Sequence, residues 1–417
     1  MSRYIIVGNG VAGITAAQSI VKADPPAEVR VFGAEPYPYY RRPLLWEFIA
    51  GQIKQDALYF RPQDWYDERG IHLQLGAQVT ALDTQAHCLT LADGSRVEYD
   101  RLLLAMGAHS FVPPLDGVDK RGVFTLRTLE DALAIKGHAQ GASTAAVIGG
   151  GLLGLETARA LHTAGLEVTV VEFASHLLPR QLDPEGAQVL QSLLETSGLH
   201  ILTGAATETI LGHEHATGVR LKACPERSRR DGHVVDGELV LISTGIRSRV
   251  ELAREAGLEV NRGVVVDERL RATVPDVYAA GDVAEFKGVV YGIIPAATEQ
   301  AQVAAANMVT EGSATYSGTI PATTLKIVGI DLASLGEATA TGEEFVVLRE
   351  VDMAGGVYRR LTLRDGKIVG AILLGDTRNV QPLKQLIGEG RDVSAYVERL
   401  LDESLDLKAL ARGQAPE

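Results

Sequence analysis

The chain has 417 residues, of which 46% are hydrophobic and 22% charged, a composition typical of a soluble globular protein rather than a disordered one. Its formal net charge of −13 argues against general affinity for nucleic acid, and no apolar run reaches the roughly 18 residues that a membrane span needs. The Met-Ser-Arg start leads directly into an apolar run and leaves no room for a signal peptide, so we expect a cytoplasmic protein of two or three domains.

The chain contains two cysteines, Cys88 and Cys224, in no Cys-x-x-Cys arrangement. This excludes an internal dithiol of that type, and it excludes a cysteine-ligated zinc or iron–sulfur cluster within the chain. Cys88 lies in an alternating, strand-like segment, which favours a half-buried structural residue. No metal site is predicted.

The N-terminal segment opens with an apolar strand over 4–7 that runs into Gly-Asn-Gly-Val-Ala-Gly at 8–13 and then into a helical pattern over 13–23. A second strand, 29–33, follows, and Glu35 stands at its end. In such a turn the first glycine makes the bend, the second lets the backbone approach a pyrophosphate, and the third lets the helix pack on the strand. An acid after the second strand is placed to accept hydrogen bonds from an adenosine ribose. One such motif alone is weak evidence, because an ordinary strand-turn-helix can carry it.

The rest of residues 1–112, the first predicted nucleotide domain, combines an irregular loop with strand patterns. Two prolines flank the tyrosines of 35–44, which indicates a fixed loop whose Arg42 is a candidate ligand contact, with a solvated loop as the alternative. A strand over 101–105 ends at Met106-Gly107, where the backbone can again approach a ligand. Before it, four segments alternate like a small antiparallel sheet with a hairpin turn at Asp93-Gly94: 71–75, 79–83, 87–91 and 96–98.

A second copy of the glycine pattern follows Pro113-Pro114, which mark the crossing into a second nucleotide domain over 113–242. A strand over 144–148 enters Gly-Gly-Gly-Leu-Leu-Gly at 149–154, and the strand that follows the next helix ends in Glu172. Two such motifs, each in strand-helix-strand context, imply two bound dinucleotides. The polar stretch 222–232 is interpreted as a surface loop, with docking of a partner by its arginines as the minor alternative. The other elements predicted here are helices over 129–139, 153–165 and 184–197 and strands over 167–172 and 239–242.

The segment 278–283 returns to the strand-glycine pattern with an acid, and a helix over 295–308 follows it. Since the second sheet is already complete, residues 243–315 are expected to rejoin the first domain. Residues 316–417 read as a third domain, and the predicted fold class is α/β: two Rossmann-like dinucleotide-binding domains with a C-terminal α+β domain. The elements predicted in that third domain are strands over 345–350, 357–363 and 368–374, a hairpin turn at Asp365-Gly366, and helices near 377–388 and 393–411.

The order of these motifs resembles that of the two-dinucleotide-binding flavoprotein reductases, and the resemblance covers nearly the whole chain. The segments that carry it are 8–13, Tyr40-x-Arg42-Pro43, 105–107, 149–156, 243–245 and 280–282. Within that superfamily the chain looks most like the rubredoxin reductases and the flavin-binding part of NADH-dependent nitrite reductase large subunits. The segments that suggest this are 31–36, 178–183, 325–331 and 373–376.

The resemblance implies that the first domain holds FAD. Glu35 would bind its adenosine ribose, Arg42 would lie near its phosphates or the flavin edge, and Asp282 would bind the ribityl chain. The helix over 295–308 would direct its N-terminal amides at the flavin, where negative charge develops on reduction. The full set of implied FAD contacts is Gly8, Gly10, Val11, Ala12, Gly13, Glu35, Arg42, Val79, Ala105, Met106, Gly107, Gly281, Asp282, Pro295 and Ala297.

The second domain would hold NAD(H). Glu156 falls where the family places an acid beside the nicotinamide and is the candidate catalytic residue. Glu172 favours NADH over NADPH, because a 2′-phosphate would meet its carboxylate and no arginine stands in the next seven residues to offset it. The implied NAD contacts are Gly149, Gly151, Leu152, Leu153, Gly154, Glu156, Glu172, Thr244 and Gly245.

The sequence departs from its relatives in two places. Disulfide reductases and NADH peroxidases of this fold need a cysteine beside the flavin, in or soon after 40–51, and this chain has none there. Related ferredoxin reductases follow the Arg-Pro element with Leu-Ser-Lys, where this chain has Leu45-Trp46-Glu47. A lysine that could pair with Glu156 is therefore missing, and a carboxylate stands in its place.

These observations predict an FAD-dependent NADH oxidoreductase in which the flavin carries the chemistry and the protein supplies orientation and electrostatics. Without a cysteine to receive them, the electrons would pass to an external acceptor: a rubredoxin, a ferredoxin, a nitrite-reductase-like partner or oxygen. The alternatives are an NADH oxidase that reduces oxygen directly and a redox-sensing protein that binds FAD and NADH and turns over slowly. The resemblance is also compatible with a homodimer contact through 316–417.

Overall fold

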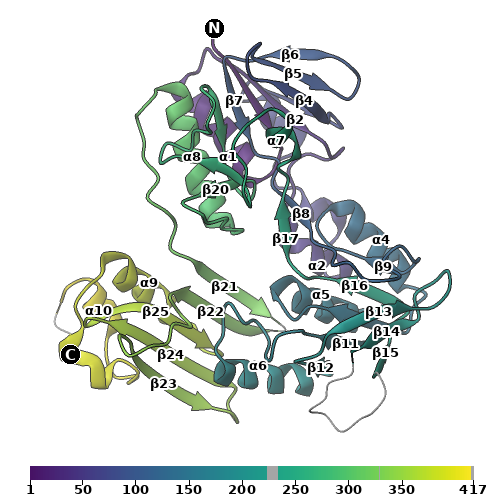
Figure 1. The fold of residues 1–417 in the computed structure, drawn as a ribbon. Helices are drawn as coiled ribbons and strands as arrows, with labels where there is room; N and C mark the ends of the chain where they lie inside the picture. The colour runs from purple at the N-terminus through teal and green to yellow at the C-terminus, as the bar shows by residue number, and fades with distance from the viewer. Residues whose placement is uncertain (223–232, 328, 415–417) are drawn as a thin grey trace. The chain divides into compact units, whose positions relative to one another are not determined.

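The computed structural model describes the chain in two compact units, each of which is formed by segments that are distant in sequence (Figure 1). The described residues are 1–222, 233–327 and 329–414, so most of the predicted 222–232 loop, with Cys224, lies outside them. The first unit consists of residues 1–45, 53–110 and 246–319. The second consists of residues 46–52, 111–245 and 320–417.

After residue 245 the chain returns to the first unit, which also holds the N-terminal segment. The second glycine motif and the C-terminal region belong to one compact unit. The division into three domains, with its boundaries, therefore stays a prediction. Among the described residues, no helix is both long and apolar enough to cross a lipid bilayer.

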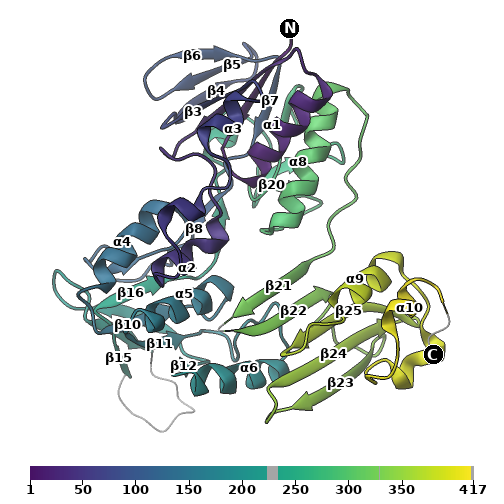
Figure 2. The same cartoon turned by 180° about the vertical axis from the view of Figure 1, so that it is seen from behind.

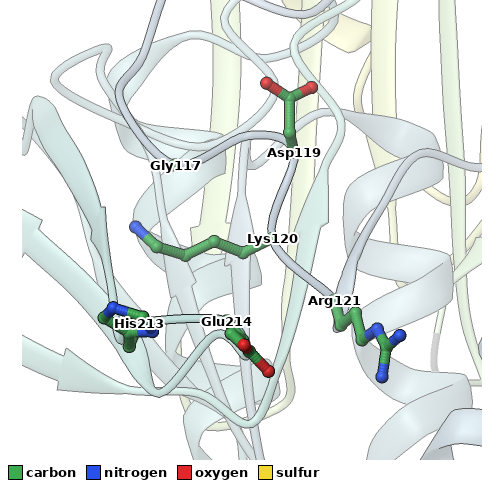
Figure 3. A pocket seen from close by; sticks show the side chains of 6 residues that line it. All are labelled: Gly117, Asp119, Lys120, Arg121, His213 and Glu214. Carbon is green, nitrogen blue, oxygen red and sulfur yellow. The ribbon is translucent and has the colours of Figure 1, made fainter.

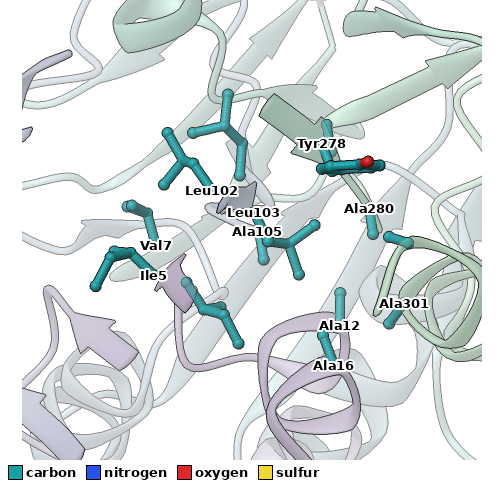
Figure 4. Close-up of a cluster of buried hydrophobic side chains, with 14 of the residues drawn as sticks. Ile5, Val7, Ala12, Ala16, Leu102, Leu103, Ala105, Tyr278, Ala280 and Ala301 are labelled. Carbon is teal, nitrogen blue, oxygen red and sulfur yellow. The ribbon is translucent and has the colours of Figure 1, made fainter. Parts of the chain in front are cut away.

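The first unit is built on a five-stranded parallel sheet in the order β19-β7-β1-β2-β3. The central strands β1 and β7 are apolar and buried after their first residue, as expected for strands covered on both faces. Helices α1 (Val11–Ala23) and α8 (Ile294–Val309) pack against each other, and Ala12, Ala16 and Ala301 allow their close approach (Figure 4). The strands are β1 (Arg3–Val7), β2 (Glu28–Gly33), β3 (Ile71–Leu75), β7 (Arg101–Leu104) and β19 (Val277–Ala279).

One strand prediction in this unit is wrong. The segment 71–75 was expected in the antiparallel sheet, but β3 pairs in parallel with β2, with Ile71 opposite Val29. The antiparallel sheet holds only β4 (Val79–Asp83), β5 (Cys88–Leu91) and β6 (Arg96–Glu98), with the predicted turn at Asp93-Gly94. The smaller elements are η1 (Arg42–Leu44), η2 (Gln55–Leu58), α3 (Gln63–Asp67), β8 (Ala108–Ser110), β17 (Ile246–Ser248), α7 (Glu251–Glu255), β18 (Val264–Val266) and β20 (Ala284–Phe286).

The second unit repeats the parallel arrangement, with the strand order β12-β11-β10-β16-β9. Its strands are β9 (Val123–Phe124), β10 (Thr144–Ile148), β11 (Glu167–Val171), β12 (His200–Leu202) and β16 (Leu239–Ile242). Its helices are α2 (Leu45–Ile49), which begins on the last residue of the first unit, α4 (Leu129–Ala139), α5 (Leu152–Thr163) and α6 (Pro184–Thr196). A three-stranded antiparallel sheet is formed by β13 (Thr207–Leu211), β14 (Gly218–Leu221) and β15 (Val234–Asp236).

The C-terminal part of the second unit is a five-stranded antiparallel sheet in the order β21-β22-β25-β24-β23, on which helix α9 (Val380–Glu389) packs (Figure 2). The predicted hairpin turn at Asp365-Gly366 joins β24 to β25. Two strands here, β21 and β22, were not predicted. The strands are β21 (Ala322–Ile327), β22 (Ile330–Gly336), β23 (Val346–Asp352), β24 (Val357–Arg364) and β25 (Lys367–Leu374).

The continuous helix predicted over 393–411 is also wrong, since the structure has a 3-10 helix, η3 (Ser394–Arg399), and a separate α10 (Leu407–Ala411). Two aspartates interrupt the apolar periodicity. Asp402 accepts a hydrogen bond from the Ser404 amide, and Asp406 accepts from two amides at the start of α10. Such local side-chain bonds compete with a continuing helix, so the chain turns and restarts.

Candidate nucleotide-binding sites

The first glycine motif forms a tight turn between β1 and α1. The Gly8 amide donates to the Phe32 carbonyl at 2.8 Å, with a backbone φ of +116° that favours glycine. A Cβ atom at Gly8 would collide with the carbonyl oxygen of Ala105, and one at Gly13 would collide with the carbonyl oxygen of Gly8. A Cβ at Gly10 would have no neighbour within 4 Å, so this backbone faces open space. The first and third glycines are thus required by packing, and the second is free for a ligand.

Predicted FAD residues from distant segments lie together at the carboxyl ends of the strands of this sheet. A Cβ built at Gly281 would lie 3.1 Å from the Ala12 Cβ and 3.7 Å from the Ala297 Cβ. The Gly281 amide donates to Gln300 Oε1 at 2.8 Å, and the Asp282 carbonyl accepts from the Ser248 hydroxyl at 2.6 Å. Sequence reasoning missed Gln300 and Ser248, which fix the 281–282 turn. Four other predicted residues are placed as follows: Val11, Val79 and Met106 are partly buried against the same core, and Pro295 lies in the first turn of α8.

Glu35 and Arg42, predicted separately, form an ion pair on the irregular loop after β2. The Tyr40 hydroxyl also donates to Glu35 Oε2, at 2.5 Å. Burial raises the pKa of this phenol, so Tyr40 stays protonated and serves as a donor. The Glu35 side chain is 26% exposed, which leaves part of the carboxylate accessible. An adenosine ribose would share this carboxylate with Arg42 and Tyr40. Gly107, with φ +68° and no neighbour within 4 Å of a Cβ, also faces open space.

The second glycine motif has the same geometry between β10 and α5. The Gly149 amide donates to the Val171 carbonyl at 2.8 Å, with φ +117°. A Cβ at Gly149 would collide with the Ser243 carbonyl oxygen, and one at Gly154 would collide with the Gly149 carbonyl oxygen. Gly151 faces open space, as Gly10 does. Leu152 and Leu153 form the first turn of α5, where a bound phosphate would lie against backbone amides.

Glu172 is held in place by backbone amides on both sides. Its two carboxylate oxygens accept from the amides of Gly150 and Ala174, each at 2.6 Å. A Cβ at Gly150 would lie 3.1 Å from the Glu172 Cβ and 2.6 Å from Leu177, which explains the middle glycine of the three consecutive glycines at 149–151. Phe173, the next residue, is 79% exposed. Sequence reasoning missed Gly150 and Phe173, although the three consecutive glycines were a visible signal.

The segment after β16 lies beside the second glycine turn, at the same end of the second sheet. The Thr244 hydroxyl donates to the Phe111 carbonyl at 2.7 Å, and the Phe111 amide donates to the Gly245 carbonyl at 2.9 Å. Gly245 has φ +108° and no neighbour within 4 Å of a Cβ. The backbone of 244–245 is therefore fixed by its own hydrogen bonds while one side of it stays open.

The helices that follow the glycine turns begin differently from α4 and α6 of the second unit. Thr128 and Asp131 form a reciprocal cap on α4, and Asp183 caps α6 through the Gly186 amide at 3.0 Å. By contrast, α1 and α5 begin at Gly10 and Gly151 with no side-chain cap and no acid in the first turn. Free amides at a helix start favour an anion. The residues present at both turns therefore fit the phosphates of a dinucleotide.

Glu156 is a half-buried carboxyl on α5, two residues after the third glycine. Burial, and then the neighbouring carboxylate of Glu47, raise the pKa of Glu156 to about 7. Helix α2, which carries Glu47, lies beside α5 in both views (Figures 1 and 2). Lys136 on α4 links this helix to α2, because its Nζ donates to the Phe48 carbonyl at 2.7 Å. Neither glutamate forms an ion pair with any side chain that the structure describes.

Two surface pockets contain no predicted site residue. One, of about 420 Å³, lies between the 117–121 turn and His213-Glu214 (Figure 3). Its Lys120 donates to the Ile210 carbonyl at 2.7 Å, so this cation is already engaged. The other, of about 490 Å³, is lined by 265–275 in the first unit. Cys88, which was expected to be half-buried, is buried at 5% exposed, and its Sγ accepts from Arg96 Nε at 3.3 Å.

Comparison with known proteins agrees with this geometry. Residues 2–307 match the family model of the pyridine nucleotide-disulphide oxidoreductases. The chain belongs to this family. Residues 321–391 match the C-terminal domain of rubredoxin NAD+ reductases. The predicted resemblance and fold class are confirmed, and the prediction of an oxidoreductase is confirmed at the level of this family.

Individual relatives extend the comparison. The chain is 36% identical over 394 residues to the NAD(P)H nitrite reductase of Bacillus subtilis, covering 94% of this chain and 48% of that protein. It is 28% identical to the NADH-rubredoxin oxidoreductase of Clostridium acetobutylicum, covering 94% of this chain and 95% of that protein. A solved structure of a covalent putidaredoxin reductase–putidaredoxin complex superposes with a TM-score of 0.87 and 27% identity, over 99% and 98% of the two chains. The chain spans about half the length of the nitrite and nitrate reductase relatives that it matches.

Proposed function

We propose that this protein is an FAD-dependent NADH oxidoreductase that passes electrons to an external iron redox protein such as rubredoxin. The observation that carries the proposal is the pair of glycine turns, each followed by an uncapped helix and each close to a glutamate that follows a neighbouring strand. Two such sites in one chain suit two dinucleotides. A family relative that reduces rubredoxin with NADH matches over nearly its whole length.

The first turn is assigned to FAD, which would accept the hydride when it is bound. Gly10 and the start of α1 would hold the pyrophosphate, and Glu35 with Arg42 would hold the adenosine ribose. The Gly281–Asp282 turn, fixed by Gln300, would receive the ribityl chain. The protein's own contribution is binding and orientation, while the cofactor carries the redox chemistry.

The second turn is assigned to NADH. Glu172 would accept from the ribose hydroxyls, because both of its oxygens are already oriented by the amides of Gly150 and Ala174. A 2′-phosphate would meet this carboxylate, so NADH is favoured over NADPH. Glu156 is assigned to the nicotinamide end of the site. The chain has no cysteine between residues 40 and 52, so electrons leave for an acceptor outside the chain.

NADH oxidation by the purified FAD-loaded protein will be faster with rubredoxin than with oxygen alone, because no internal sulfur competes for the electrons. The measurement is the loss of NADH absorbance under nitrogen with oxidised rubredoxin, compared with an air-saturated sample without a carrier. A ferredoxin and a nitrite reductase catalytic domain serve as alternative acceptors in parallel. Equal rates with and without carrier would instead identify an NADH oxidase. Slow flavin reduction with a long-lived charge-transfer band would identify a redox-sensing protein.

The affinity for NAD+ will rise with pH through about 7, because the carboxyl of Glu156 loses its proton there and an anion attracts the cationic nicotinamide. The affinity for NADH, whose ring is neutral, will change little. Glu47→Gln removes the like charge and lowers the Glu156 pKa, so the rise moves to lower pH, while Glu156→Gln abolishes it. Equilibrium titration of the two nucleotides at pH values on both sides of the Glu156 pKa of about 7 gives the profiles. An identical midpoint in wild type and Glu47→Gln would contradict the coupling.

A further inference from the structure

Asn9 lies between the first two glycines of the turn assigned to FAD. The oxygen of its side-chain amide has a hydrogen-bond partner, and the nitrogen has none among the described residues. Its Oδ1 accepts from the Tyr66 hydroxyl at 2.8 Å. Its Nδ2 is buried, and no hydrogen-bond acceptor lies near it among the described residues. The sequence analysis assigned no role to Asn9, since it occupies a variable position of the glycine motif.

Tyr66 fixes which way the amide points. The tyrosine is fully buried and packs edge-to-face against Trp65, with ring centroids 5.1 Å apart. The backbone of Tyr39 also hydrogen-bonds to the Tyr66 hydroxyl, which leaves the hydroxyl proton for Asn9 Oδ1. Because the tyrosine engages the oxygen, the NH2 group of the amide is turned away from it.

A buried N–H group without an acceptor is expensive. Its desolvation is not offset by a hydrogen bond, so such groups are rare in folded proteins and are normally explained by a partner. Removing the amide would cost the folded protein nothing in hydrogen bonding at Nδ2. A hydrogen bond from Nδ2 to an acceptor outside the chain would therefore be favourable.

The position of Asn9 indicates which part of the ligand it meets. A Cβ built at Gly33 would lie 3.3 Å from the Asn9 Cβ, so the side chain lies between the glycine turn and the end of β2. Glu35 follows two residues after Gly33. Asn9 thus belongs to the turn whose amides are assigned to the pyrophosphate, and its Cβ lies near the end of β2, two residues before the glutamate assigned to the ribose. Every exposed group of this part of FAD that an N–H could reach is an oxygen acceptor on phosphate or ribose.

We propose that Asn9 Nδ2 donates a hydrogen bond to a phosphate or ribose oxygen of the adenylate half of FAD, with Tyr66 as the positioning residue that orients the amide. This inference rests on the proposed function, in which the first glycine turn holds FAD. It adds to that function a side-chain donor at a site otherwise formed by backbone amides and the Glu35–Arg42 pair.

The test titrates apoprotein with FAD, with ADP and with FMN, which lacks the adenylate half, by calorimetry. Asn9→Ala is expected to weaken both FAD and ADP by about 10- to 100-fold, the range for a hydrogen bond to a charged group, and to leave any FMN binding unchanged. Tyr66→Phe is expected to weaken FAD less, and to have no further effect in an Asn9→Ala background. Asn261→Ala, at an exposed asparagine of the same unit whose amide donates to Glu285 at 3.4 Å, is the matched control and should leave the affinities for FAD and ADP unchanged.

A thermal readout separates binding from folding. Asn9→Ala removes the unsatisfied Nδ2 donor but also leaves the buried Tyr66 hydroxyl without its acceptor, so each variant is compared with its own apoprotein, and the rise in Tm on adding FAD should shrink. An FAD Kd within twofold of wild type, or destabilised apoprotein with an unchanged FAD-induced rise, would overturn the assignment and identify a structural amide satisfied by water. If wild-type protein bound neither FAD nor ADP, the proposed function itself would fail.

Discussion

Gly154→Ala will reduce NADH-dependent flavin reduction by about 100-fold while FAD stays bound, the cost expected when a positioning element moves by about 1 Å. The added Cβ would collide with the carbonyl oxygen of Gly149, which belongs to the backbone of the same turn and cannot rotate away. Either α5 moves off the sheet or the turn opens, and both displace the amides assigned to the pyrophosphate. Stopped-flow measurement of flavin bleaching against NADH concentration gives the rate and the apparent affinity.

The matched control for this substitution is Gly137→Ala on α4. A Cβ there has no neighbour within 4 Å, and the residue is exposed in a helix. The change should stabilise the protein by about 0.5–1 kcal/mol, since alanine loses less backbone entropy than glycine in a helix, and should leave NADH oxidation unaltered. NADH affinity of Gly154→Ala equal to that of wild type would show that the turn does not hold this nucleotide.

Asp183→Asn will destabilise the protein by about 3–5 kcal/mol, because it leaves a buried cation without its partner. Asp183 caps α6 and accepts from Arg360 and Tyr358, each at 2.6 Å, and Arg360 is 3% exposed. These contacts join α6 to β24 of the C-terminal sheet, and both elements belong to the second unit. Denaturant unfolding followed by circular dichroism measures the loss. Glu337→Gln, which removes an exposed partner of Arg364, is the control and should cost about 1 kcal/mol or less.

The pH dependence of this loss has a defined sign. Burial opposes ionisation of Asp183, but hydrogen bonds from Tyr358, Gly186 and Arg360 outweigh it and hold its pKa below the usual range. The stabilisation is therefore present above the unfolded pKa of about 3.9 and is lost as the pH falls through the folded value. The difference between wild type and Asp183→Asn should shrink below about pH 4. A difference of less than 1 kcal/mol at pH 7 would show that the buried pair contributes no more than a surface pair.

Apart from the helix over 393–411 and the unpredicted strands β21 and β22, elements defined by short-range pattern were predicted closely, whereas strand pairing between distant segments was not. The helix predicted at 184–197 ends at Thr196, one residue short of the prediction, because its cap and apolar spacing are local features. By contrast, the alternation at 71–75 indicates a strand but not its neighbour. Its pairing with β2 depends on a segment some forty residues earlier, and the hydrogen-bonding edge that it meets is absent from its own sequence.

The nucleotide sites show the same division. The glycines could be identified from sequence because the first and third of each motif prevent a clash within the turn or with the next strand end, and the second leaves the backbone open to a ligand. The partners of these turns could not. Nothing in the sequence joins Gln300 to Gly281 or Tyr66 to Asn9, since these bonds depend on how helices and loops pack after folding. The effect of Glu47 on Glu156 also emerges only when α2 is placed beside α5.

By itself the sequence determined that this is a two-dinucleotide protein without a flavin-side cysteine, because glycine turns, strand-end acids and the absence of a residue type are properties of local chain order. Only the tertiary structure decided that Glu35 pairs with Arg42, that the Asn9 amide is turned by Tyr66, and that Asp183 meets Arg360. These are interactions between side chains brought together from separate elements. Their geometry and their desolvation arise from packing, and no local pattern encodes either one.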